Sequence, residues 1–334
     1  MKKTIFLIFL TALFMFPSQS FCQTKLLKFA LLAPEGSTWS KVMHSFDKEL
    51  RKKTSGRVGF KFYEGAILGD ERDVIRKMRI GQVHAAGFTG LGLGLINPNV
   101  RVLELPMLVE TYAEADAVRN KLKAQFETGF SKKGFEMLGW SETGFVYILS
   151  NKPISSRKDM SGVKMWAWEG DQLVEALYKA FDIVPIPTSI TEVLTSLQTH
   201  LIDGVYAPPL AAIALQWYTQ TKYMTDLKLS DSTGGFLVTK RALNLISPAD
   251  RKTLKKLGSK YSEILLKKIR EDNDKSFTTL IQAGLKLVEI SDSERQNIRE
   301  TCKKVWSELV GKLYSQSFLD AAISAVDDFR KSKK

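Results

Sequence analysis

The sequence predicts an α/β protein made of two similar units and a largely helical last third. Short apolar runs alternate with amphipathic stretches along most of the chain, which is typical of a parallel sheet covered by helices on both faces. A second series of such runs begins near Val146. From Ser247 onward the pattern is mostly that of long, charged helices.

The first unit shows strands and helices in strict alternation. Its strands are short and apolar, and the run VGFKFYEG has the period of two that a strand requires. Its first helix has Ser37 or Thr38 near the N-cap and Gly56 at its end, which are ordinary start and stop signals. Strands are expected at 26–34, 58–65 and 84–90, and helices at 37–56 and 70–80.

The second unit repeats the theme with further apolar runs. They read VYILSNKPI, GVKMWAW, DIVPIPT and DGVYAPP, and they lie at 146–154, 162–168, 182–188 and 203–209. The last third contains amphipathic helical runs around 251–271 and 292–313. No long flexible linker separates the units, so crossing strands and helices are expected to join them.

The first 22 residues have the pattern of a secretory signal. Two lysines follow Met1, an apolar run extends from Ile5 to Phe16, and polar residues come next. The protein is therefore expected to be exported, with a periplasmic location. Cleavage after Ser20 or Cys22 and acylation of Cys22 both stay open. No later segment approaches the roughly 18 to 20 apolar residues of a membrane span.

The chain is basic, with 49 Lys and Arg against 36 Asp and Glu and a formal net charge of +13. Removal of the signal, which contains Lys2 and Lys3, leaves 47 basic and 36 acidic residues and a formal net charge of +11. The excess is scattered along helical stretches, so it is interpreted as solvated helix surface. Attraction to an anionic membrane surface stays as an alternative, whereas export argues against a nucleic-acid partner.

Motifs for catalysis, metal binding or nucleotide binding are missing from the sequence. His44, His84 and His200 have no metal-ligand spacing, which predicts no metal site. The stretch GFTGLGLG (87–94) lacks the Lys-Ser/Thr of a phosphate loop and is interpreted as a loop that faces a ligand. There is no G-x-S-x-G elbow. We therefore expect neither an enzyme nor a cofactor.

Four blocks in a fixed order carry a resemblance to a known family. They are YEGAILGDERDVIRKMRIGQVHAAGFTG (63–90), VLELPMLVET (102–111), SNKPISSRKDMSGVKM (150–165) and PIPTSITEVLTSLQTHLIDGVYAPP (185–209). With the helical tail, they resemble the substrate-binding, DctP-type subunit of tripartite ATP-independent periplasmic (TRAP) transporters. The resemblance covers nearly the whole chain after the signal.

The resemblance implies a two-lobed periplasmic binding protein fold with parallel or mixed sheets, flanking helices and a long C-terminal bracing helix. The ligand would be held where the lobes close on each other, and open α/β sheets do bind ligands at the carboxyl ends of their strands. The expected division is a signal at 1–22, a first lobe at 23–147 plus about 235–275, and a second lobe at 148–234 plus about 276–334.

The family's polar contacts to organic acids are absent at the matching positions. Members that bind acids usually hold the carboxylate with an arginine, which gives two parallel charge-assisted hydrogen bonds. The corresponding position here is Trp166, a further arginine position is Val146, and an asparagine position is Ala207. This chain therefore resembles an atypical branch, and the hypothesis is a hydrophobic or amphipathic ligand.

Further aromatic and apolar residues stand near the predicted lobe interface. Phe88 and Leu91 lie in the glycine-rich stretch, Tyr206 follows Asp203-Gly204, and Phe236 follows a glycine pair. For each of them, ordinary core packing is the alternative interpretation. The complete set of candidate ligand contacts is Trp166, Val146, Ala207, Tyr206, Phe88, Leu91, Trp168, Phe236 and Trp39.

The resemblance implies partners and a mode of action. The protein would capture a small molecule and deliver it to a membrane permease driven by an ion gradient, and some branches also use a periplasmic tetratricopeptide-repeat protein. The alternatives are an organic-acid binder with a different clamp, an exported sensory or lipid-carrier protein, and an exported hydrolase.

Overall fold

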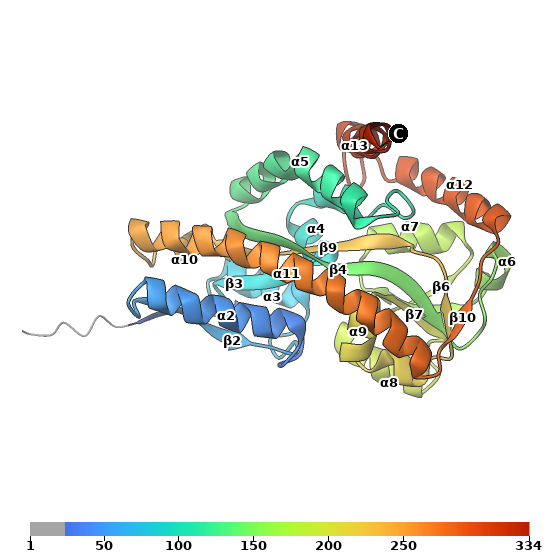
Figure 1. Cartoon of the computed structure of the whole chain (residues 1–334), viewed down its shortest axis with the longest axis horizontal. Helices are drawn as coiled ribbons and strands as arrows, with labels where there is room; N and C mark the ends of the chain where they lie inside the picture. The colour runs from blue at the N-terminus through green and yellow to red at the C-terminus, as the bar shows by residue number, and fades with distance from the viewer. Residues whose placement is uncertain (1–23, 334) are drawn as a thin grey trace, which may run out of the picture.

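The computed structural model describes residues 24–333, and the expected signal at 1–22 with Cys22 lies outside them. Ten strands form one connected, mixed sheet, in the order β2-β1-β3-β9-β4-β7-β5-β6 with β8 and β10 joined beside β4. Figure 1 shows helices on both faces of this sheet. The strands are β1 (Lys25–Ala30), β2 (Val58–Tyr63), β3 (Ala85–Thr89), β4 (Phe135–Ser150), β5 (Lys164–Trp168), β6 (Val184–Thr188), β7 (Gly204–Ala207), β8 (Tyr223–Thr225), β9 (Ser230–Thr239) and β10 (Lys286–Val288).

The helices occupy most of the remaining chain. None of those within 24–333 is both long and apolar enough to cross a membrane. They are α2 (Thr38–Lys53), α3 (Glu71–Arg79), α4 (Gly90–Ile96), α5 (Tyr112–Lys132), α6 (Arg157–Met160), α7 (Gln172–Ala180), α8 (Val193–Gln198), α9 (Pro209–Ala214), α10 (Lys240–Leu243), α11 (Pro248–Gln282), α12 (Asp292–Glu308) and α13 (Gln316–Ser332), with 3-10 turns η2 (Pro98–Glu104), η3 (Ile190–Glu192) and η4 (Trp217–Gln220).

Local sequence signals account for the helix starts. The Ser37 hydroxyl accepts a hydrogen bond from the backbone N–H of Ser40 at the start of α2, as predicted. Thr111 and Glu114 form a reciprocal capping box at the start of α5. Asp171 caps α7, because its carboxylate accepts from the backbone N–H groups of Leu173 and Val174.

Strand β4 takes part in both halves of the sheet. Its residues Phe135–Val146 pair antiparallel with β9, which continues to β3, β1 and β2. Its last residues, Tyr147–Ser150, pair with β7. We refer to the group β1, β2, β3, β9 and the first part of β4 as the first lobe, and to the group around β5, β6 and β7 as the second lobe.

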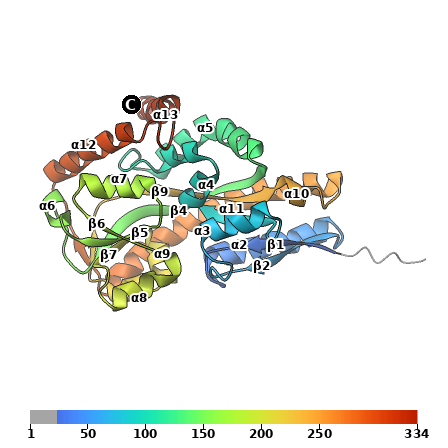
Figure 2. The ribbon, with the colours of Figure 1, turned by 180° about the vertical axis from the view of Figure 1, so that it is seen from behind.

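The 35-residue helix α11 braces the two lobes. It packs against α2 of the first lobe, along β4, and against α9 of the second lobe. Figures 1 and 2 show it lying diagonally across both. The predicted fold class, with its long bracing helix, is confirmed. The helix is not the end of the chain, because α12 and α13 follow, and α13 packs against α5. The predicted residue boundaries of the lobes stay a prediction.

Candidate ligand-binding site

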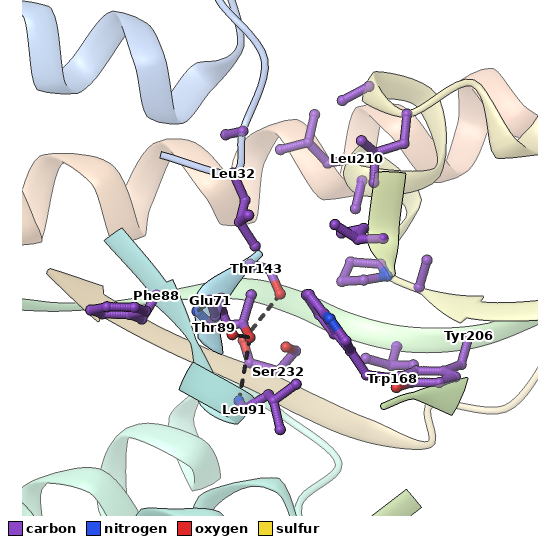
Figure 3. Close-up of a pocket in the computed structure, with 18 of the residues that line it drawn as sticks. Leu32, Glu71, Phe88, Thr89, Leu91, Thr143, Trp168, Tyr206, Leu210 and Ser232 are labelled. Atoms are coloured by element: carbon purple, nitrogen blue, oxygen red, sulfur yellow. Dashed lines mark hydrogen bonds between the residues drawn. The ribbon is translucent and has the colours of Figure 1, made fainter. Parts of the chain in front are cut away.

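A cavity of about 400 Å³ lies between the two lobes. Its walls come from the segments that follow β1, β3, β5 and β7, so it sits at the carboxyl ends of parallel strands. Figure 3 shows Leu32, Phe88 and Leu91 on one side, and Trp168, Tyr206 and Leu210 on the other. The volume falls in the range of about 300–1,000 Å³ that is common for small-molecule sites.

The second-lobe wall is a cluster of aromatic rings. Trp166 stacks on Tyr206 at a centroid distance of 4.9 Å and contacts Trp168 at 5.3 Å and Trp217 at 5.1 Å. The Trp166 indole N–H donates to the Thr188 carbonyl at 3.1 Å, which fixes the ring. Trp166 is 2% exposed and Trp168 is 7% exposed. Trp166 therefore serves both as a core residue and as cavity floor.

The first-lobe wall combines apolar side chains with a buried carboxylate. Trp39 of α2, Phe88 of β3 and Leu91 of α4 line it. The carboxylate of Glu71 accepts from the backbone N–H of Thr89 at 2.5 Å and of Gly92 at 2.7 Å, and so caps α4. Burial raises the pKa of Glu71 to about 7 even though these hydrogen bonds favour the charged form.

The glycine-rich stretch was expected to be a loop that faces a ligand; part of it lines the cavity, but it is built as the end of β3 and the helix α4, and its glycines make room for charged side chains. Its second half forms α4, where Gly90 and Gly94 lie one turn apart. A Cβ on Gly90 would clash with the carboxylate of Glu104, and one on Gly94 would lie 2.6 Å from the Arg101 Cδ. The glycines thus let these two side chains of η2 pack against the helix backbone.

An arginine at the cavity is already paired with carboxylates of the protein. Nη2 of Arg101 donates to both oxygens of Asp171, at 2.8 and 2.9 Å, and Nη1 pairs with Glu104. Burial lowers the pKa of Arg101, but the charges of Asp171 and Glu104 outweigh it and the pKa is raised. Burial raises the pKa of Glu104. The guanidinium is thus charged and occupied.

The cavity brings together eight of the nine side chains singled out from the sequence. Trp39, Phe88, Leu91, Val146, Trp166, Trp168, Tyr206 and Ala207 all line it. Phe236 does not, because it lies at 0% exposure in the core beside Phe46 of α2. Phe236 and the glycine pair before it lie on β9 between β3 and β4, and the phenyl ring packs in the apolar core with residues of α2 and α11. The contact of the other eight with a ligand stays a prediction.

Sequence reasoning missed the charged cluster and one aromatic residue. Asp171 had a signal, since an aspartate before an amphipathic run is an N-cap pattern. Arg101 and Glu104 pair with each other three residues apart, but nothing local places them at the cavity, because Asp171, the other partner of Arg101, lies 70 residues away. Trp217 lies in a short 3-10 turn after a residue with left-handed backbone, Gln216, where no periodicity marks a buried side.

Two lobes with a cavity between them and a bracing helix are the architecture of a solute-binding protein. The chain belongs to the bacterial extracellular solute-binding proteins of family 7, whose model matches residues 29–313. The resemblance to TRAP solute-binding subunits is thereby confirmed, and so is the expectation that the protein binds a solute and does not catalyse a reaction.

Similar proteins support this assignment. A solute-binding protein of Verminephrobacter eiseniae is 28% identical over 254 residues, which is 75% of each chain. The sialic acid-binding periplasmic protein SiaP of Vibrio cholerae is 23% identical over 321 residues, covering 94% of this chain and 95% of SiaP. The crystal structure of the sugar acid binding protein DctPAm from Advenella mimigardefordensis with galactonate matches with a TM-score of 0.86, at 21% identity over 91% of this chain and 98% of that one.

Proposed function

We propose that this TRAP-type solute-binding protein captures an uncharged molecule with a hydrophobic body and hands it to a membrane permease. The apolar wall that carries the proposal is built from aromatic and aliphatic side chains of both lobes. The hydroxyls of Thr143, Ser230 and Ser232 also line the cavity and offer hydrogen bonds to an uncharged polar end. An amphipathic ligand matches both parts.

The charges of the cavity disfavour an acid. Its lining contains the carboxylates of Glu71, Glu104 and Asp171 and the cations Arg101 and Lys41. Lys41 is exposed, and Arg101 is paired twice. A ligand carboxylate would lose its hydration without gaining a free cation in the interior, which costs several kcal/mol.

Burial of an apolar ligand supplies enough free energy without such a clamp. Removing about 300 Å² of apolar surface from water contributes about 7 kcal/mol at roughly 25 cal/mol per Å². That suffices for binding near the micromolar range only where the cavity is preformed. The packed aromatic cluster around Trp166, fixed by its indole hydrogen bond, meets this requirement.

Binding of an organic acid is the second candidate, because one relative is named for sialic acid and a solved neighbour holds galactonate. A thermal-shift series separates the two, with straight-chain alcohols and alkyl amides on one side and succinate, galactonate and sialic acid on the other. We expect the neutral series to raise Tm and the acids to leave it unchanged. A saturable rise with any of the acids would contradict the proposal.

The ligand class is read directly from protein purified without denaturation. We expect mass spectrometry of an organic extract, compared with a matched blank, to show a stoichiometric neutral apolar or amphipathic molecule. A stoichiometric sugar acid or dicarboxylate would favour the second candidate instead.

A further inference from the structure

The buried pair of Arg101 and Asp171 joins the two lobes across the cavity. Arg101 lies in η2, which packs against α4 and β9 of the first lobe. Asp171 follows β5 in the second lobe and caps α7. Both residues are 4% exposed, and both line the cavity. The contact therefore spans the two lobes.

This pair is a charge-assisted contact between an arginine and a carboxylate. One nitrogen, Nη2, reaches both oxygens of the Asp171 carboxylate at 2.8 and 2.9 Å. Charge-assisted bonds of this kind are the usual means by which proteins bind carboxylates. In this chain the carboxylate comes from the protein itself.

We propose that Asp171 is a specificity-determining residue whose carboxylate occupies Arg101 in the position that an acidic solute would need. The inference rests on the proposed function, because it explains how the cavity is kept for uncharged molecules. A solute acid could take Arg101 only by leaving Asp171 buried beside Glu104 without its partner, and an unpaired buried charge is strongly unfavourable.

Helix capping alone does not require this charge. Oδ1 of Asp171 accepts from the backbone N–H groups of Leu173 and Val174 at 3.1 and 3.3 Å. Asparagine or serine caps a helix as well as aspartate does. Replacing Asp171 by either residue thus keeps the cap and removes the carboxylate.

The test removes the Asp171 carboxylate by mutation and supplies acetate in solution as a substitute for it. In Asp171→Ser we expect the Tm to rise saturably with sodium acetate, compared with sodium chloride at equal ionic strength, and succinate to bind at least about tenfold more tightly than to the wild type. The wild type should show no such response. A folded Asp171→Ser protein that stays as insensitive to acetate and succinate as the wild type overturns the inference.

Two further variants make the result specific. Asp70 caps α3 in the same way, accepting from the backbone N–H groups of Arg72 and Asp73, and is not part of the cavity lining. Asp70→Ser should therefore remain insensitive to acetate.

The double variant Asp171→Ser/Arg101→Gln should lose the response to acetate, because the cation that binds acetate is gone. Retention of the acetate effect in the double variant also overturns the inference. Should Asp171→Ser not fold, Asp171→Asn, with the same shape and cap, undergoes the same test.

Failure of this inference is distinguishable from failure of the proposed function. If the wild type itself binds succinate or galactonate, the neutral-ligand proposal is wrong and the role of Asp171 falls with it. If the wild type binds only neutral molecules and Asp171→Ser gains no acid, only the role of Asp171 is wrong.

Discussion

Trp166 and Trp168 lie on the same face of β5, but they are not equally suitable for mutation. Trp166 is held by Tyr206 on one side and by the Thr188 carbonyl at its indole nitrogen. Replacing it with arginine would bury a charge at a site that is 2% exposed and would change folding together with binding. Trp168 is the cleaner position for testing the aromatic wall.

Replacing Trp168 with leucine should weaken neutral-ligand binding by about tenfold, because less apolar surface is then covered. Titration calorimetry with the alcohol that gives the largest thermal shift measures the change. The matched control is Trp140→Leu on β4, whose indole donates to Glu127 at 3.0 Å and which does not line the cavity. It should lower stability and leave the affinity unchanged. Equal affinity of Trp168→Leu and the wild type would remove Trp168 from the site.

At the residue scale, the sequence indicated more of the apolar lining of the cavity than of its charged lining. A family register places Val146, Trp166 and Ala207 because each stands at a fixed offset from a conspicuous motif. The ion pair of Arg101 with Asp171 depends on a tertiary contact that no local spacing encodes. Phe236 was predicted to line the cavity but lies in the core. The reason is related, since strand periodicity defines two faces of a strand without showing which one is directed to the ligand.

Among the contacts of α11, those of one buried asparagine, Asn273, reach two neighbouring elements at once. Nδ2 of Asn273 donates to the Thr143 carbonyl of β4 at 2.9 Å, and its Oδ1 accepts from the backbone N–H of Leu210 in α9 at 3.1 Å. One side chain thus links the bracing helix to the central strand and to the second lobe. The amide suits this position because it carries both a donor and an acceptor.

Asn273→Ala should lower the free energy of unfolding by about 1–3 kcal/mol, because it leaves the Leu210 N–H and the Thr143 carbonyl without these partners. Urea unfolding followed by far-UV circular dichroism measures the loss. Asn297→Ala, at an exposed position of α12, is the control and should change stability little. If both variants lose the same amount, the buried contacts of Asn273 do not stabilise the fold as described.

Element types were largely predictable, whereas element lengths and contacts were not. The alternation of apolar runs indicated β1, β2, β3, β5 and β7, and the charged amphipathic pattern indicated α11. The glycines of α4 concealed a short helix, because glycine is a poor helix former whose use here depends on the side chains of Arg101 and Glu104. The 16-residue β4 exceeds the usual strand length because it serves two lobes.

At the scale of the whole molecule, the two lobes have a strand and a helix in common and are not joined by a flexible linker. Strand β4 belongs to the ladders of both lobes, and α11 packs on both. Between the lobes, Nη2 of Arg72 on α3 donates to the carbonyl of Glu169 after β5 at 2.9 Å. The two-unit organisation was visible in the sequence, but these shared elements depend on pairings between distant segments.

We expect the ligand-free protein to unfold in one cooperative transition, because unfolding of either lobe would remove pairing partners from β4. Scanning calorimetry tests this by comparing the calorimetric enthalpy with the van't Hoff enthalpy. A calorimetric enthalpy clearly above the van't Hoff value, or two resolved peaks, would show that the lobes unfold independently.

The aromatic wall also gives the protein an optical reporter of its own occupancy. Four of the six tryptophans, Trp39, Trp166, Trp168 and Trp217, line the cavity. The indoles of Trp168 and Trp217 lie within 5.3 Å of that of Trp166, close enough for their excited states to couple. A molecule that enters the cavity changes the polarity around most of the emitting rings at once. Unlabelled protein can therefore be screened for ligands by the wavelength of its intrinsic emission.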